Sequence, residues 1–183
     1  MTSQEFVLDV MRAQGKSDAL DLRTRAPELD GTALIAEEAK VPQFNGSKDY
    51  SSWVAGAPVW EEIDGERQIF TLITPHNASH YPGSTPSNTP ALWSIRHTKD
   101  PKQAKPWLAP NGTSGRYALD ECATENGHVY RNNHENNEFS PSAQPERWTD
   151  LGTIEDVQQI ALVEYGHLEY YVRLGKIKVE KVV

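Results

Sequence analysis

The chain has 183 residues, a formal net charge of −8 and one cysteine. Nucleic-acid binding needs clustered Lys and Arg, so this charge argues against it, and no apolar run is long enough for a membrane span. A single cysteine excludes a disulfide framework. The N-terminal residues lack the basic and apolar regions of a signal peptide, so we expect synthesis in a cytoplasm.

Residues 1–44 are predicted to form an N-terminal helical segment. In residues 3–15, Phe6, Val7, Val10 and Met11 share one helical face, and Gly15 is expected to end the helix. A second helix is predicted over residues 32–40, before Pro42, which cannot continue it. Its apolar face is narrow, so it needs a packing partner.

The middle of the chain is typical of short strands joined by turns. In residues 45–97, Val59–Ile63 and Phe70–Thr74 flank the turn signal "DGER" and predict a hairpin. In residues 108–152, "RYALDECAT" and "HVY" flank the turn signal "ENG" and predict a second one. Between these modules, residues 98–107 are basic and bounded by proline, which indicates a linker.

Residues 153–183 are predicted to be a helical tail. Thr153 can cap "IEDVQQIALVEYG", and Gly166 separates this stretch from "HLEYYVRLG". The final "KIKVEKVV" alternates, and is either a strand or a disordered tail. The broad apolar and aromatic face of this tail is the expected contact surface between subunits.

A short motif occurs twice. "TPSNTPALW" (residues 85–93) and "SPSAQPERW" (residues 140–148) share the pattern Pro-Ser-x-x-Pro-x-x-Trp. The flanking residues also correspond, so that Trp93 matches Trp148, Phe70 matches Tyr130, and Cys122 matches Val59. We expect these aromatic residues to be buried. The predicted fold is therefore mainly β, with two tandem small modules of short antiparallel sheet, flanked by short N- and C-terminal helices.

The segments "YALDEC", "GHVY" and "SPSAQPERW" carry a family resemblance. Their order resembles that of the chitin-binding type 3 modules of carbohydrate-binding families 5 and 12, over roughly residues 50–152. With helical ends and no export signal, the chain looks most like a phage or prophage virion protein of a tail fibre, baseplate or head fibre. The resemblance implies a virion protein that attaches to host surface polysaccharide. The alternative is an architectural part, for capsid decoration or as a fibre–baseplate adaptor, without glycan binding.

The sugar-binding loops lack the aromatic pair that family members use to grip a glycan, so other residues must be considered. A pyranose stacks on a flat exposed ring while polar neighbours bind its hydroxyl groups. The amide groups of "NNHENN" and the nearby rings make the second module's loop the expected site, and Tyr81 is the ring of the first. The candidate residues are Asn132, Asn133, Asn136, Asn137, Phe139, Tyr81 and His134.

Catalysis and metal binding are not expected. His76 and His80 are four residues apart, but flanking prolines oppose a helix and no third ligand is near. Modules of about fifty residues leave no deep cleft for a pair of catalytic carboxylates, so we expect a non-enzymatic protein without cofactor. Modules this small are marginally stable without disulfides or metals. We therefore expect a homo-oligomer, preferably a trimer, with other virion proteins as partners.

Overall fold

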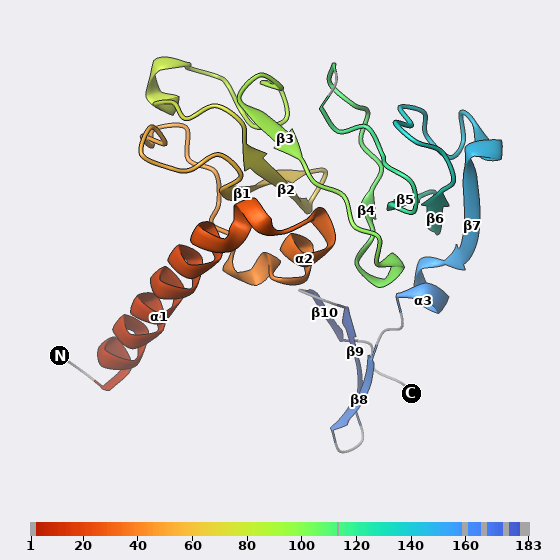
Figure 1. Cartoon of the computed structure of the whole chain (residues 1–183). Coiled ribbons are helices and arrows are strands. Elements are labelled where there is room, and N and C mark those ends of the chain that lie inside the picture. Colours follow the sequence, from red (N-terminus) through yellow and green to blue (C-terminus); the bar gives the residue numbers. More distant parts are fainter. Residues whose placement is uncertain (1–2, 113, 159–160, 166–167, 174–175, 180–183) are drawn as a thin grey trace. The chain divides into compact units, whose positions relative to one another are not determined.

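The computed structural model describes residues 3–112, 114–158, 161–165, 168–173 and 176–179. The chain forms two compact units: unit 1 comprises residues 1–97 and 109–116, and unit 2 comprises residues 98–108 and 117–183. Unit 1 contains two helices and one antiparallel sheet of order β1-β2-β3 (Figure 1). Its elements are α1 (Ser3–Arg25), α2 (Gly31–Ala36), β1 (Pro58–Ile63), β2 (Glu66–Leu72) and β3 (Trp93–Ile95).

Unit 2 contains a four-stranded sheet of order β4-β5-β6-β7, in which only β4 runs parallel to its neighbour. Its strands are β4 (Lys105–Pro106), β5 (Cys122–Glu125), β6 (His128–Asn132) and β7 (Trp148–Thr153), and helix α3 (Ile154–Val157) follows. A further antiparallel sheet has the order β10-β9-β8, with β8 (Ala161–Tyr165), β9 (Leu168–Arg173) and β10 (Lys176–Val179). Among the described helices, none has the length and apolar character needed to cross a membrane.

The expected fold class is therefore confirmed only in its coarse outline of two small sheets with helices before and after them. The N-terminal helix is longer than predicted, because Gly15 does not end it. The Gln14 side chain donates to Asp18 across that turn at 2.6 Å, and Leu22, further along the helix, is fully buried. One glycine costs a helix about 1 kcal/mol, which burial of one leucine offsets.

The predicted linker over residues 98–107 is wrong, because this segment belongs to unit 2. Strand β4 pairs in parallel with β5, and Thr98 forms a bridge with Cys122. Pro106 is tolerated because β4 is an edge strand, where one face of the backbone needs no ladder hydrogen bond. The composition of this segment resembles that of a linker. Its pairing partner lies 18 residues further along the chain, so local composition does not reveal the pairing.

The predicted helical tail over residues 153–183 is also wrong. Thr153 does cap a helix, with its side chain accepting from the Asp156 amide, but α3 ends at Val157 and three strands follow. The segments "ALVEY", "LEYYVR" and "KIKV" are rich in β-branched and aromatic residues, which favour strands. For the end of the chain we left open a strand or a disordered tail. Lys176–Val179 form a strand, and residues 180–183 lie outside the described residues.

The sequence repeat corresponds to a repeated strand register. Trp93 of β3 lies opposite Leu72, two residues after Phe70. Trp148 of β7 lies opposite Asn132, two residues after Tyr130. The two tryptophans therefore occupy equivalent positions.

One predicted match within the repeat is shifted by a residue. Val59 lies opposite Phe70 in unit 1, and Ala123 lies opposite Tyr130 in unit 2. Ala123 is therefore the counterpart of Val59, and Cys122 corresponds to Pro58. Both members of the corrected pair are fully buried, which explains why each is small.

Each repeated tryptophan packs edge-on against a buried tyrosine. The Tyr50 and Trp93 ring centroids are 5.2 Å apart with an interplanar angle of 89°, and those of Tyr117 and Trp148 are 5.2 Å apart at 70°. Edge-to-face pairs gain energy beyond the burial of their area. Each closing strand is thus fixed to the segment that precedes its hairpin.

The repeated Pro-Ser step has an equally specific partner. The Ser87 amide and hydroxyl donate to the two Glu61 carboxylate oxygens at 2.9 and 3.1 Å. In unit 2 the Ser142 amide and hydroxyl donate to Glu125 at 2.7 and 3.1 Å. A carboxylate near the end of each first hairpin strand thus holds the loop that returns to the tryptophan. The sequence signal, a Glu beside each hairpin turn, was present but was not connected to the motif.

Removing this clip should destabilise unit 2. Glu125→Ala leaves the Ser142 amide without its carboxylate acceptor, and we expect a loss of about 1 kcal/mol, since the clip is solvent-exposed. Chemical denaturation monitored by tryptophan fluorescence measures this loss. Glu146→Ala, an exposed glutamate of the same loop, is the matched control and should change the unfolding midpoint little. Equal effects of the two variants would contradict the role of the clip.

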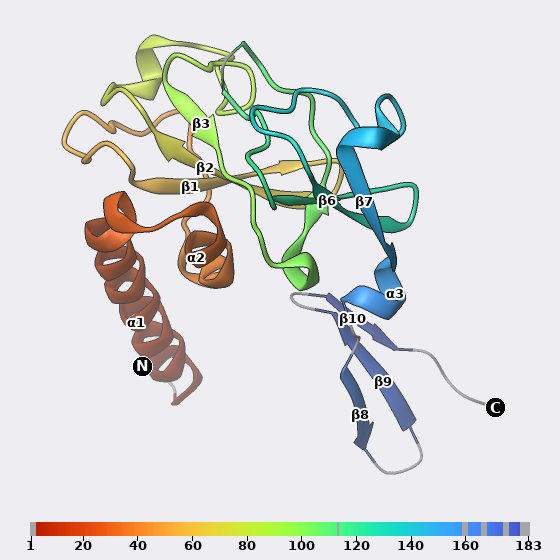
Figure 2. The same ribbon diagram turned by 45° about the vertical axis from the view of Figure 1, so that its right-hand side comes forward.

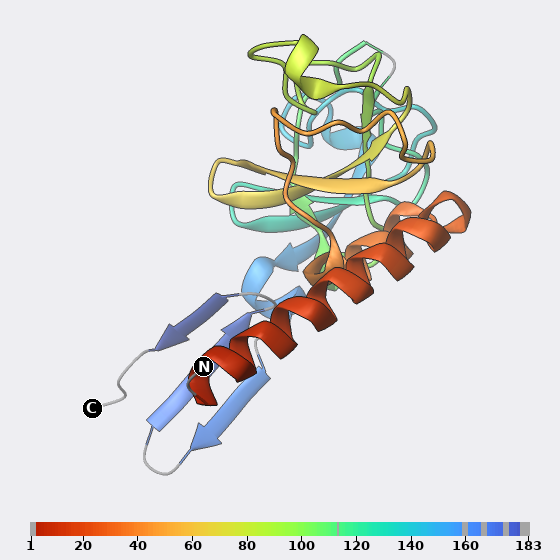
Figure 3. The same ribbon diagram turned by 90° about the vertical axis from the view of Figure 1, so that its left-hand side faces the viewer.

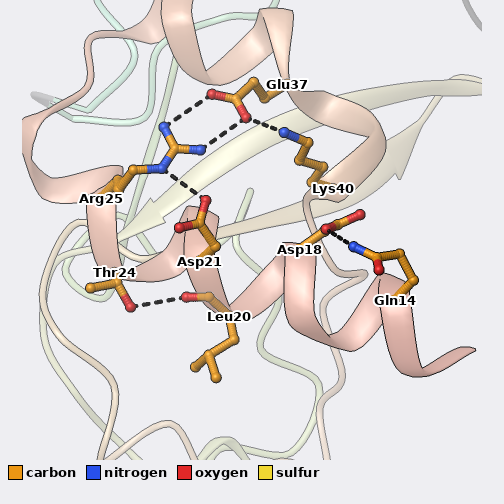
Figure 4. A network of polar contacts seen from close by, with 8 residues as sticks. All are labelled: Gln14, Asp18, Leu20, Asp21, Thr24, Arg25, Glu37 and Lys40. Atoms are coloured by element: carbon orange, nitrogen blue, oxygen red, sulfur yellow. Dashed lines mark hydrogen bonds and ion pairs between the residues drawn. The ribbon is translucent and has the colours of Figure 1, made fainter.

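The hairpin of unit 1 is covered by helices on its second face. Ile69 of β2 packs with Leu22, Leu34 and Ile35 of α1 and α2, and Figure 2 shows α2 beside β1 and β2. At the end of α1, Arg25 makes a two-pronged ion pair with Glu37 at 3.0 and 3.2 Å. Lys40 donates to the same carboxylate (Figure 4). The hydrogen bonds from Arg25 and Lys40 lower the pKa of Glu37 to about 2, so this connection persists to low pH.

A buried histidine makes unit 1 sensitive to acid. His97 is 7% exposed, its Nε2 lies 2.9 Å from the Gly115 carbonyl oxygen, and burial lowers its pKa to about 4. Its own carbonyl meets the start of α2 so closely that a Cβ on Gly31 would collide with it. His97 is therefore neutral and tightly enclosed at pH 7.

We expect the free energy of unfolding of unit 1 to fall as the pH drops from 6.5 to 4. The unfolded chain binds the His97 proton near pH 6.5, whereas the folded chain binds it only near pH 4. Denaturation midpoints measured across this window test the expectation. His97→Gln should flatten the part of the slope that this residue causes. An identical pH profile in the variant would contradict the assignment.

Candidate functional site

The asparagine-rich loop of unit 2 (residues 132–137) is held by hydrogen bonds of two buried asparagine side chains. Asn132 and Asn137 are both fully buried. The Asn132 amide nitrogen donates to the carbonyl groups of Tyr117, Ala118 and His134, and its oxygen accepts from the Asn137 side chain at 2.9 Å. These two amides are therefore occupied by the fold, and the prediction that they bind glycan is wrong.

The remaining candidates of that loop are placed differently. Asn133, His134 and Asn136 are exposed, and Asn136 has a positive φ of 54° that serves the turn. The Asn133 side-chain oxygen accepts from Thr149 at 3.0 Å. The Phe139 ring is half-buried and carries the Arg147 guanidinium 5.0 Å from its centroid. The Phe139 ring is therefore partly covered, and the exposed ring beside these amides is the His134 imidazole.

Mutation should separate structural from binding asparagines. Asn132→Ala removes a fully buried amide that donates to three carbonyl groups and accepts from Asn137, so we expect a loss of about 3 kcal/mol in unfolding free energy. Asn136→Gly, which keeps the positive φ accessible, should leave stability nearly unchanged. Thermal unfolding of the two variants makes the comparison, and a neutral Asn132→Ala would contradict this interpretation.

The ring predicted in unit 1 does lie on the surface. Tyr81 is 47% exposed. It follows the 3-10 turn Ala78–His80, whose first amides are capped by the Asn77 side chain. The loop between the paired positions Leu72 and Trp93 is five residues longer than its counterpart between Asn132 and Trp148. Tyr81 lies within this longer loop of unit 1.

Tyr81 is held by a buried aromatic layer. Its centroid lies 5.8 Å from that of His76 at an angle of 78°. His76 is 8% exposed, packs edge-on against Trp93 at 5.5 Å, and has Nδ1 2.8 Å from the Thr74 carbonyl oxygen. Both hydrogen bonding and ring packing thus fix His76, and His76 supports one side of Tyr81. The Tyr81 ring is therefore exposed on one side and packed against His76 on the other, and we call it the platform.

Polar groups adjoin this platform. Asp49 pairs with Asn77 in an isolated antiparallel bridge, which places its exposed side chain beside the Tyr81 loop. The Ser51 hydroxyl lies 2.5 Å from an Asp49 oxygen and lowers the pKa of that carboxyl, with smaller contributions from His80 and His76. Asp49 is therefore an anion at neutral pH, and carboxylate oxygens are strong acceptors for sugar hydroxyl groups.

The same loop is closed by its own hydrogen bonds. The Ser84 amide donates to the Tyr81 carbonyl oxygen at 3.0 Å, and the Asn88 side chain donates to that of Gly83 at 3.1 Å. Gly83 itself has a φ of 80°, which only glycine adopts readily. Because these contacts already fix the loop, ordering the loop would cost little free energy when a ligand binds.

Metal chemistry finds no support in the described part of the chain. No group of three or more His, Cys, Asp or Glu side chains there is arranged to hold a metal ion. His76, considered as a ligand because of its spacing from His80, instead serves the aromatic layer. Cys122 is buried, and burial raises the pKa of its thiol, as fits a small core residue.

The sequence identified Tyr81 but missed the residues that make it a site. Asp49 lies 32 positions away and carries no motif. The role of His76 in supporting Tyr81 could not be predicted, because its aromatic neighbours come from three other segments. The one available signal was the extra length of the first loop relative to the second. No protein family model matches the chain, and no curated protein matches it.

Proposed function

We propose that the protein is a non-enzymatic polysaccharide-binding protein whose contact surface is the Tyr81 loop of unit 1. The observation that carries this proposal is the exposed Tyr81 ring, supported by a buried histidine, on a loop that begins next to the Asp49–Asn77 bridge. The apolar face of a pyranose stacks on such a ring, and Asp49 and His80 can bind its hydroxyl groups. In the second unit, the Phe139 ring is half-buried and lies under the Arg147 guanidinium.

The biological setting is part of the same proposal. The repeat resembles chitin-binding type 3 modules, and modules of this kind suggest a phage virion component of a tail fibre, baseplate or head fibre. In that setting the ligand is a host surface polysaccharide and the partners are other virion proteins. Synthesis would take place in the bacterial host before incorporation into the particle.

A second candidate function is architectural, and unit 2 favours it. Two of its loop amides, Asn132 and Asn137, are used internally, and its Phe139 ring lies under Arg147. Unit 2 thus has the properties of a rigid spacer that retains the repeat scaffold without a ligand surface. If unit 1 behaves in the same way, the protein is a capsid decoration or a fibre–baseplate adaptor.

Retention of the protein on purified cell-wall polysaccharide distinguishes the polysaccharide-binding function from the architectural one. Tyr81→Ala should weaken binding at least tenfold, about 1.4 kcal/mol, because the stacking face is lost. The melting temperature should change little, since the ring is 47% exposed. The matched control is Val54→Ala, which trims a 51% exposed side chain of the same unit and should bind as the parent does.

A double variant tests the site predicted from sequence in the other unit. Phe139→Ala combined with Asn136→Ala should also retain binding, because the platform lies in unit 1. If Tyr81→Ala binds as well as the parent, or if the parent binds no surface polysaccharide, the architectural function replaces the proposed one. If the unit 2 variant alone loses binding, the site belongs to unit 2.

A further inference from the structure

Two cationic side chains of unit 1 contact one buried aromatic ring. Arg23 stands in the last turn of α1, at the end of the helix that approaches the sheet of unit 1 (Figure 3). Its Cζ lies 4.5 Å from the centroid of the Trp53 ring, and the Lys48 Nζ lies 4.2 Å from the same centroid. Trp53 is buried, whereas both cations are half-buried. We call Arg23, Lys48 and Trp53 the cation cluster.

The fold holds each member of the cation cluster in place. The fully buried Leu22 anchors the last turn of α1 in the core of unit 1. The Lys48 carbonyl oxygen accepts from the Ala78 amide at 3.0 Å. The Trp53 ring packs edge-on against the buried Tyr50, with centroids 4.8 Å apart at 88°. The two charges are therefore preorganised, so a ligand that binds between them does not have to order this part of the chain.

The two positive charges lie close enough to repel each other. Burial and the charge of Arg23 both lower the pKa of Lys48. Among the described residues, no carboxylate forms an ion pair with Arg23 or Lys48. The adjacent Asp49 carboxylate instead accepts from the Ser51 amide and hydroxyl at 2.8 and 2.5 Å. Two like charges are thus held together in a chain of net charge −8, and the described part of the chain supplies no anion for them.

A second cation–ring contact in unit 1 shows what an ordinary one looks like. The Arg67 Cζ lies 4.6 Å from the centroid of the Trp60 ring. Arg67 of β2 is paired in register with Glu62 of β1, so an acid stands directly opposite it on the neighbouring strand, and such cross-strand pairs of opposite charge are stabilising. The cation cluster differs in having two cations on one ring. Stabilisation of the fold by a cation–ring contact, about 0.5–1 kcal/mol at exposed sites, needs only one.

We propose that the cation cluster binds a phosphate group. A phosphate group with one substituent carries a charge of about −1.5 to −2 at pH 7, which two cations neutralise, whereas a carboxylate carries a single charge. A guanidinium over a ring uses its charge in that contact, so its N–H donors remain for the oxygen atoms of an anion. The Lys48 ammonium adds three donors. Phosphate reaches such a site either as the free ion or as a group on a sugar.

Calorimetric titration of the full chain with inorganic phosphate at constant low ionic strength tests the proposal. This probe has no sugar ring, so its result is independent of polysaccharide binding at the platform. The parent should bind one phosphate per chain, and Arg23→Gln and Lys48→Gln should each weaken binding at least tenfold. The matched control, Arg67→Gln, removes the cation from the Trp60 ring and should bind as the parent does. A parent that binds no phosphate at millimolar concentration, or equal affinities in all three variants, would overturn the proposal.

A conservative variant and two further probes complete the test. Lys48→Arg keeps the charge and should retain binding within a few-fold, so a loss in Lys48→Gln alone is a loss of charge rather than of folding. Acetate should bind the parent more than tenfold more weakly than phosphate, and equal binding of the two would contradict a phosphate site. Glucose 6-phosphate separates the two sources of the ligand: tighter binding than inorganic phosphate assigns the site to a phosphorylated sugar, and equal or weaker binding assigns it to the free ion.

Discussion

The edge-on contact between a tyrosine and a tryptophan organises both units. Tyr50 stands before the first hairpin and Trp93 after it, and the same order holds for Tyr117 and Trp148. Each contact closes a long stretch of chain around a hairpin, which a small unit could not otherwise keep in place, because little of its surface is buried. The strand register, the Glu–Ser clip and the return loop all depend on this closure.

The two units differ in how the loop between hairpin and tryptophan is held. In unit 2 the position opposite the tryptophan is Asn132, whose amide satisfies carbonyl groups of the loop from within. In unit 1 that position is Leu72, and His76 fills the interior by ring packing instead. Amide satisfaction draws the loop inward, whereas ring packing leaves room for extra residues. The exposed Tyr81 is a consequence of the second solution.

The two halves of α1 differ in their burial. The helices of unit 1 cover one face of its hairpin through Ile69, and the ion pairs of Glu37 fix the last turn of α1. The same helix then continues beyond the unit with an apolar surface that no described residue of unit 1 covers. The C-terminal half of α1 thus stabilises the fold of unit 1 through Leu22.

The sequence by itself determined the two hairpins and the exposure of Tyr81. It also determined that Phe70 and Trp93 in the first repeat are equivalent to Tyr130 and Trp148 in the second. Turn signals and alternating residues act over a few positions, so local chemistry specifies them. The tertiary structure alone decided that residues 98–107 join a sheet, that the C-terminal segment forms strands, and that Asn132 and Asn137 are buried. It also placed His76 against the Tyr81 ring and paired Asp49 with Asn77, four residues before Tyr81. These outcomes depend on partners many residues away, whose packing and hydrogen bonds override local propensity.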